Sequence, residues 1–407
     1  MDSERISRIQ ENLHTAGLAA VVCALPSNVL LLTGYWPVVG ESIAISVCGG
    51  PTALLVPEDE AELAGAGFAD SVETFKPGAL SEKPGVSETV KPHLANTLHK
   101  LNIKSGPIGV ESGSSSQAAP YVSMYLYGND LPDILHELLP NSTFIRIEAW
   151  IETLKSIKTP AELEKLRQAC AIAKSAYEMA APQLRTGMRE PEAAQLLQAL
   201  LSSGERPRLP AQRCSGFAFC MSGPNSAKAY AAYARTRMRV LEPEDFVMMH
   251  CNSYVDGFWT DVTRTFTLRP PNERQDKIYA AILSAREAAL ATIKPGVRAE
   301  EVDFAAEQVI QDCKLGQYIK HDTGHGVGYA AMSAHSRPRV RAGSQDVLQE
   351  GMVFNVEPAV YIEGYGGVRH CDMVAVTNRG YELLTEFQSD IGHLTATAVS
   401  SVRTEAV

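Results

Sequence analysis

The residues best suited to chemistry lie in four short blocks in the second half of the chain. His250 precedes Asp261 by eleven positions, His325 stands between two glycines, Glu357 precedes a proline, and Cys371 follows Glu357 by fourteen positions. These residues are two imidazoles, two carboxylates and a thiol, the groups that transfer protons and bind divalent metal ions. Any one block alone would suit a packed histidine or a surface acid, but together they indicate a catalytic or metal-binding cavity.

Short apolar runs that resemble strands lie beside most of these blocks. Residues 246–250 read Phe-Val-Met-Met-His, 353–356 read Val-Phe-Asn-Val, and 373–376 read Met-Val-Ala-Val. Two longer segments, 275–294 and 299–313, have the spacing of helices. Strands can direct the polar side chains at their ends into one cavity. We therefore expect an α+β domain in the second part of the chain.

The first part of the chain has a different pattern. The strand-like runs 19–23, 43–47 and 53–56 alternate with helical stretches, which predicts an α/β domain. Thr159, Pro160 and Glu162 then predict the capped start of a helix. We place the boundary just before this helix, with a smaller domain over residues 1–155 and a catalytic domain over residues 156–407.

Composition excludes several classes of partner. With 37 Lys and Arg against 47 Asp and Glu, the 407-residue chain has a net charge of −10, which disfavours nucleic acid and anionic membrane surfaces. Its apolar runs are shorter than the roughly 18–20 residues of a membrane-spanning helix, and its N-terminus lacks the apolar core of a secretory signal. We expect a cytoplasmic protein without a membrane or nucleic-acid partner. The eight cysteines include no Cys-x-x-Cys, so neither a zinc ribbon nor a disulfide framework is expected.

The order and spacing of the four blocks resemble those of the creatinase, aminopeptidase P and prolidase family. Catalytic domains of that family have the pita-bread fold and carry five metal ligands in the order Asp, Asp, His, Glu, Glu. Supporting stretches occur at residues 28–34, 154–158, 222–226 and 351–354. The resemblance covers nearly the whole chain. It implies a pita-bread catalytic domain preceded by a smaller α/β domain of the creatinase and prolidase type.

Three of the family's five metal-ligand positions are retained and two are changed. The retained ones fall on Asp261, His325 and Glu357. The family's first Asp aligns with His250, and its last Glu aligns with Cys371. These replacements put the family's usual metal centre in question.

Four further residues are expected to bind substrate. The family's substrate-binding histidine aligns with Tyr230, and its later histidine best matches His335 if a short insertion is allowed. Trp259 lies two positions before a retained ligand position and would either line the pocket or pack in the core. Arg369 would either contact substrate or lie at a solvated strand edge. Arg264 is expected to pair with the site carboxylates.

The two changed positions alter what the site can bind. Four carboxylates balance two divalent ions in the family, whereas only Asp261 and Glu357 remain here, so a dinuclear manganese or cobalt centre is not expected. One hypothesis places a single zinc or iron ion on these two residues with His325 and Cys371, with or without His250. The other follows creatinase and ectoine hydrolase and has no metal.

The resemblance implies hydrolysis of a C–N bond in a small polar molecule, such as an amide, an amidine or a cyclic amidine. His325 or His250 would be the general base, while Asp261 and Glu357 would bind a positive group of the substrate. Cys371 could also be a nucleophile or a packed thiol. The alternatives are a metal-dependent Xaa-Pro dipeptidase or aminopeptidase with atypical ligands, a non-catalytic scaffold, and a lyase acting on a small zwitterion. Family behaviour also implies a homodimer.

Overall fold

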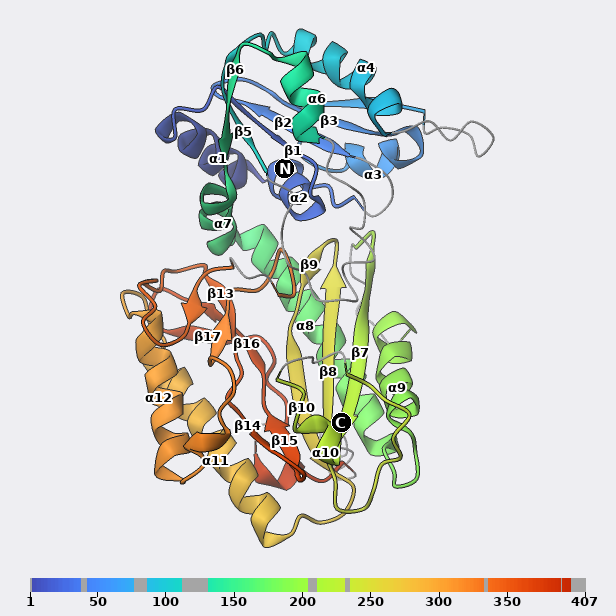
Figure 1. Ribbon diagram of the computed structural model, residues 1–407, viewed down its shortest axis with the longest axis vertical. Coiled ribbons are helices and arrows are strands. Elements are labelled where there is room, and N and C mark those ends of the chain that lie inside the picture. The colour runs from blue at the N-terminus through green and yellow to red at the C-terminus, as the bar shows by residue number, and fades with distance from the viewer. Residues whose placement is uncertain are drawn as a thin grey trace, which may run out of the picture. The chain divides into compact units, whose positions relative to one another are not determined.

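The computed structural model describes residues 2–37, 42–76, 86–111, 131–203, 211–230, 235–332, 336–388 and 390–396. They form two compact units that divide between Lys155 and Ser156 (Figure 1). Within these described ranges, no helix combines the length and apolar character needed to cross a membrane.

The first unit is built on a mixed six-stranded sheet with the strand order β4-β3-β2-β1-β5-β6. Strands β1 and β2, and β2 and β3, pair antiparallel, whereas β1 with β5, β3 with β4, and β5 with β6 pair parallel. The α/β character expected of this part of the chain is confirmed. Its elements are α1 (Ser3–Thr15), β1 (Ala20–Cys23), α2 (Pro26–Thr33), β2 (Ile43–Val47), β3 (Thr52–Pro57), η1 (Glu58–Glu60), α3 (Ala61–Gly65), β4 (Ser71–Phe75), α4 (Val86–Lys100), β5 (Gly106–Val110), α6 (Leu131–Leu138), β6 (Ser142–Arg146) and α7 (Glu148–Ser156).

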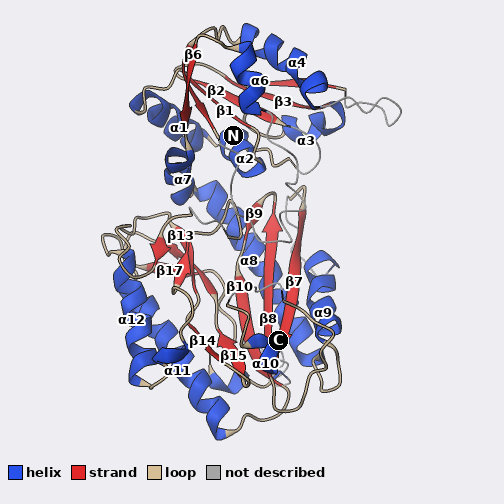
Figure 2. Ribbon diagram, viewed as in Figure 1, coloured by secondary structure: helices blue, strands red, loops and turns tan. Residues whose placement is uncertain are grey.

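The second unit combines long helices with several small antiparallel sheets (Figure 2). Its elements are α8 (Pro160–Ala180), η2 (Ala181–Gln183), α9 (Glu190–Ser203), β7 (Cys214–Ser222), α10 (Gly223–Ser226), β8 (Phe246–Val255), β9 (Phe258–Trp259), β10 (Val262–Thr267), α11 (Glu273–Thr292), α12 (Ala299–Asp312), η3 (Gly316–Tyr318), β11 (Gly324–His325), β12 (Arg339–Val340), β13 (Val353–Val356), β14 (Ala359–Ile362), β15 (Gly366–Arg369), β16 (Asp372–Val376), β17 (Tyr381–Leu383) and η4 (Ile391–His393).

Helix α8 begins with the predicted capping box and packs against the central strands. The Thr159 side chain accepts from the Glu162 backbone N–H, and the Glu162 carboxylate accepts from the backbone N–H of Thr159. Farther along the helix, the Tyr177 hydroxyl contacts the Met249 carbonyl at 2.8 Å and the Val262 carbonyl at 3.1 Å. These contacts fix α8 against β8 and β10, the strands that bear much of the candidate site.

An apolar core of the second unit joins helices α11 and α12 to strands β13 and β16. Residues such as Ile282, Val302, Phe354 and Val374 are buried together in one apolar cluster. Strand β13 pairs antiparallel with β16, so that Val356 lies opposite Asp372. This pairing brings the segment before Glu357 next to the segment after Cys371.

Candidate active site

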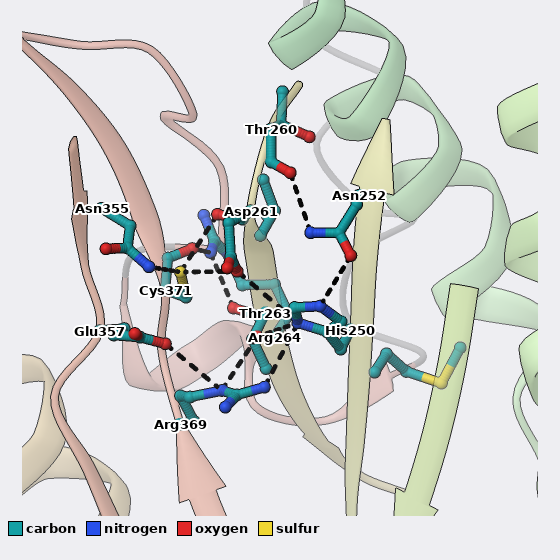
Figure 3. A network of polar contacts seen from close by, with 12 residues as sticks. His250, Asn252, Thr260, Asp261, Thr263, Arg264, Asn355, Glu357, Arg369 and Cys371 are labelled. Atoms are coloured by element: carbon teal, nitrogen blue, oxygen red, sulfur yellow. Dashed lines mark hydrogen bonds and ion pairs between the residues drawn. The ribbon is translucent and has the colours of Figure 1, made fainter. Parts of the chain in front are cut away.

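The five residues that could do chemistry lie on strands of the second unit or directly beside them. Figure 3 shows four of them close together, namely His250, Asp261, Glu357 and Cys371. His250 is on β8, Asp261 immediately precedes β10, Glu357 follows β13, and Cys371 lies between β15 and β16, while His325 is on β11. A backbone bridge between Thr263 and Cys371 links β10 to this last segment. The predicted residues therefore converge from five separate stretches of sequence.

The two glycines around His325 are required by close backbone approach. A Cβ atom on Gly324 would lie 2.0 Å from the Asn355 carbonyl oxygen, and one on Gly326 would lie 2.0 Å from the Arg337 carbonyl oxygen. No larger residue fits at such distances, so the Gly-His-Gly block lets β11 lie tightly between its neighbours. This packing explains why the histidine is flanked by glycine on both sides.

His325 presents a ring nitrogen to both retained carboxylates. Its Nδ1 lies 3.1 Å from the Gly326 carbonyl and is assigned as the N–H donor, which leaves the lone pair on Nε2. Nε2 is 3.8 Å from Asp261 Oδ2 and 3.8 Å from Glu357 Oε1. The Asn355 amide also reaches Nε2, at 3.3 Å. The His325 side chain is 20% exposed, so solvent and substrate can reach it.

His250 is buried and both its ring nitrogens have partners. The Asn252 amide donates to the Thr260 carbonyl, so its oxygen faces His250 Nε2 at 3.2 Å and Nε2 is the N–H donor. The Nδ1 lone pair lies 2.9 Å from the Thr263 hydroxyl and 3.3 Å from Arg369 Nη2. Burial and, secondly, the charge of Arg369 hold the pKa of His250 well below its ordinary value. The ring is therefore neutral.

Arg369 is a buried cation inside the site. Its Nε donates to the Thr263 hydroxyl at 3.0 Å and lies 3.9 Å from Glu357 Oε2, while Nη1 reaches the Tyr361 hydroxyl at 3.5 Å. Figure 3 shows the guanidinium between Glu357 and His250. Burial alone would lower the pKa of Arg369, but the negative potential from Tyr361, Glu357 and Asp261 raises it. Arg369 does not lie at a solvated strand edge, because it is 5% exposed.

Cys371 is a buried thiol next to the carboxylates. Its sulfur is 3.1 Å from the Asp261 carbonyl oxygen and 3.5 Å from Asp261 Oδ1, so the S–H group donates toward Asp261. Asn355 Nδ2 approaches the sulfur at 3.7 Å. Burial, followed by the charges of Asp261 and Glu357, raises the pKa of Cys371 well above its ordinary value. A thiol in this state is a poor nucleophile by itself.

The carboxylates repel each other in the buried site. The pKa of Asp261 is raised to about 6, chiefly by burial and secondly by the charge of Glu357. Asp261, Glu357 and Cys371 nevertheless each bring one ligand atom within 4.8 Å of the other two. This donor set could hold one divalent ion. His250 Nε2 and Nδ1 contact Asn252 and Arg369, and Cys371 is a thiol at the position where the family resemblance implies a carboxylate.

The remaining residues singled out from the sequence lie in different surroundings. Trp259 is buried and its ring stacks on Phe217 with centroids 6.0 Å apart. Tyr230 is 46% exposed, and its ring centroid lies 5.5 Å from that of Tyr361. His335 lies outside the described residues. The expectation for Arg264 was wrong, because it pairs with Asp372 at 2.5 Å instead of with the site carboxylates.

Several polar residues around the site were not expected from the sequence. Asn252 contacts the His250 ring, and the amide nitrogen of Asn355 contacts the His325 ring. The Tyr361 hydroxyl accepts from Arg369 at 3.5 Å and lies 2.8 Å from His321 Nε2. Asn355 lies two positions before Glu357, and alternate residues of a strand share a face. That spacing was the available signal for Asn355; the other contacts depend on how distant strands meet.

Both parts of the chain match models of known protein families. Residues 164–378 match the description Metallopeptidase family M24, and residues 5–167 match the Creatinase/Prolidase N-terminal domain. An Xaa-Pro dipeptidase of Pyrococcus horikoshii is 29% identical over 394 residues, which cover 96% of this chain and 99% of that protein. An Xaa-Pro dipeptidase of Pyrococcus furiosus is 28% identical over 390 residues, covering 95% and 99%.

Solved structures share the architecture. The prolidase from Pyrococcus horikoshii OT3 has a TM-score of 0.75 at 28% identity, covering 95% of this chain and 99% of that chain. The X-Pro aminopeptidase from Thermotoga maritima MSB8 has a TM-score of 0.76 at 22% identity, covering 93% and 99%, and shows the likeness of fold alone. The expected pita-bread fold behind a smaller α/β domain is confirmed, as is the expected enzyme class. The chain therefore belongs to metallopeptidase family M24 and is a hydrolase of C–N bonds.

Proposed function

We propose that this chain hydrolyses a C–N bond in a small polar molecule that carries a positive group, with His325 as the general base. The observation that carries the proposal is the charge of the site. Asp261 and Glu357 are two acids, and Arg369 supplies one fixed positive charge. One negative charge is left over when both acids are ionised, and it favours an amidinium or ammonium group of the substrate.

Of the two imidazoles, His325 is the better placed to accept a proton. It is partly exposed, and its Nε2 faces both carboxylates across 3.8 Å. The Asn355 amide nitrogen lies 3.3 Å from Nε2. A water that takes its place would donate a hydrogen bond to the Nε2 lone pair. His250 is buried against Asn252 and Arg369, so its role is to position Thr263 and the guanidinium. This geometry weighs against His250 as the base.

The protein then has two roles in the reaction. His325 takes a proton from the attacking water and returns it to the leaving nitrogen, as a general base and then a general acid. Asp261 and Glu357 hold the substrate's positive group and so orient the scissile bond toward that water. A divalent ion bound at this site would supply Lewis-acid activation of the water or the substrate.

The proposal is tested by assaying the full chain against a panel of small amides, amidines and cyclic amidines, with and without a chelator. We expect turnover of at least one cationic member and a loss of about a hundred- to ten-thousandfold in kcat for His325→Gln. His393→Gln is the matched control, because His393 lies in the same unit and its side chain is 27% exposed. Equal activity of His325→Gln and the control would reject His325 as the base.

A second candidate function is an Xaa-Pro dipeptidase. It is favoured by relatives with that name that align over 96% and 95% of this chain. Release of proline from an Xaa-Pro dipeptide, faster than any reaction on the small-molecule panel and lost with a chelator, would establish it in place of the first candidate.

We also propose that the chain is a homodimer, as its family resemblance implies, and that its working domains are residues 1–155 and 156–407. The separation into two compact units between Lys155 and Ser156 supports the second point. The molar mass of the purified chain in solution tests the first point.

A further inference from the structure

We propose that the chain binds one thiophilic divalent ion, of the zinc class, through Asp261, Glu357 and Cys371. These three side chains bring their ligand atoms within 4.8 Å of one another. The inference deepens the proposed function: with the ion bound, Asp261 and Glu357 hold the ion in place of a positive group of the substrate, and the ion would activate the water that His325 deprotonates. It rests on the proposed function only for this use of the ion, because binding can be measured without turnover. It differs from the two-ion, oxygen-rich centre that the family resemblance implies.

The donor geometry suits a small ion. Oxygen and sulfur ligands bound to zinc at their usual distances lie about 3.5 Å apart in a tetrahedral site. Asp261 Oδ1 and Cys371 Sγ are already 3.5 Å apart. Three protein ligands leave one open position, which is the arrangement of catalytic zinc sites. A thiolate among the ligands favours zinc or another borderline-soft ion over manganese or magnesium.

The charges balance for one ion only. Asp261, Glu357 and the Cys371 thiolate together carry three negative charges. The buried guanidinium of Arg369, 3.9 Å from Glu357, carries one positive charge. One divalent ion brings the sum to zero, whereas a second would leave two uncompensated positive charges in a buried site, which is costly. Arg369 thus supplies positive charge that a second ion would otherwise bring.

The imidazoles are not needed to hold this ion. His250 Nε2 donates a hydrogen bond to the Asn252 side-chain oxygen, and its Nδ1 accepts one from Arg369. Both ring nitrogens are therefore engaged. His325 lies 3.8 Å from each carboxylate and stays available to accept a proton. Binding replaces the proton on the Cys371 sulfur with the metal, and that proton leaves to solvent.

Cobalt(II) is the probe, because a cobalt–thiolate bond gives a near-ultraviolet charge-transfer band. The full-length chain would carry Cys313→Ser throughout, because Cys313 is exposed and could bind cobalt by itself. We expect the metal-free protein to take up one equivalent of cobalt with this band. Cys371→Ser should lose the band, and Cys251→Ser, a buried cysteine of β8, should keep it.

A second variant tests what limits the number of ions. The double substitution His250→Asp with Cys371→Glu restores two carboxylates, so it should bind a second equivalent of cobalt and show no thiolate band. A double variant that stays at one equivalent would overturn the charge argument.

Other outcomes would also overturn the inference. These are a folded chain that binds no cobalt, a chain that binds two equivalents before substitution, and a band that survives in Cys371→Ser. If Cys371→Ser does not fold, X-ray absorption of cobalt in the Cys313→Ser protein decides, since one sulfur neighbour per ion supports the site and none refutes it. A negative result here leaves the turnover test of the proposed function intact.

Discussion

Replacing Asp261 with asparagine should stabilise the metal-free chain at neutral pH. The pKa of Asp261 is raised from 3.8 to about 6, chiefly by burial and secondly by the charge of Glu357. A rise of that size corresponds to about 3 kcal/mol of unfavourable free energy for the ionised folded state. Asparagine has nearly the same shape and no charge to desolvate, so the variant should recover up to that amount.

The raised pKa of Asp261 also determines how the free energy of unfolding changes with pH. Between about pH 4 and pH 6 the folded Asp261 holds a proton that the unfolded chain has lost, so the folded state binds more protons. The stability of the wild type therefore falls as pH rises through this window, and the loss is complete above the folded pKa. The advantage of Asp261→Asn should be largest near about pH 8 and vanish below about pH 4.

Urea unfolding at about pH 8, 6 and 4 in the presence of a chelator measures the effect. The signal is Trp259, the one tryptophan in residues 156–407, after Trp36 and Trp150 are replaced by phenylalanine. Asp346→Asn is the control of opposite sign: hydrogen bonds from Arg339 overcome burial and lower the pKa of Asp346, so its loss should destabilise the chain at neutral pH. An Asp261→Asn variant that is less stable than the wild type at about pH 8, or equally shifted at every pH, would refute the reasoning.

Three further outcomes are expected from single substitutions. Arg264→Met should cost about 3–5 kcal/mol of unfolding free energy, because it leaves Asp372 buried with one partner fewer; an unchanged urea midpoint would contradict this. Gly326→Ala should lower the melting temperature and the activity together, since its Cβ would lie 2.0 Å from the Arg337 carbonyl, while Gly343→Ala, with open space around it but a positive φ, should affect stability alone. Thr159→Ala should cost about 1 kcal/mol through loss of the α8 cap, with no change in KM.

Some of the site was within reach of sequence reasoning because its residues have characteristic types and spacing. The Gly-His-Gly block, the Glu-Pro pair and Asp261 identify three polar positions at strand ends, and the structure places His325 Nε2 3.8 Å from each of the two carboxylates. The replacements at His250 and Cys371 were also visible, because a motif shows which residue types it lacks. Local signals were equally sufficient for the α8 capping box, since all its partners lie within four residues.

The interaction partners of those residues could not be predicted from the sequence. Arg264 was expected beside the site carboxylates, yet its guanidinium reaches Asp372, 108 positions away. Strand pattern says that alternate residues share a face, but it does not say which distant strand that face meets. Asn355 had a usable signal in its spacing from Glu357, whereas Tyr361 had none.

The sequence by itself determined the family, the order of the domains and the residue types available for catalysis, because these depend on motifs and local periodicity. Only the tertiary structure decided what those residues can do. It set Arg369 against His250, 119 positions away, and so made one imidazole a fixed, neutral support and left the other open. It also buried Asp261, Glu357 and Cys371 together. Burial and distance set charge states and metal affinity, and both arise only when segments far apart in the chain pack against each other.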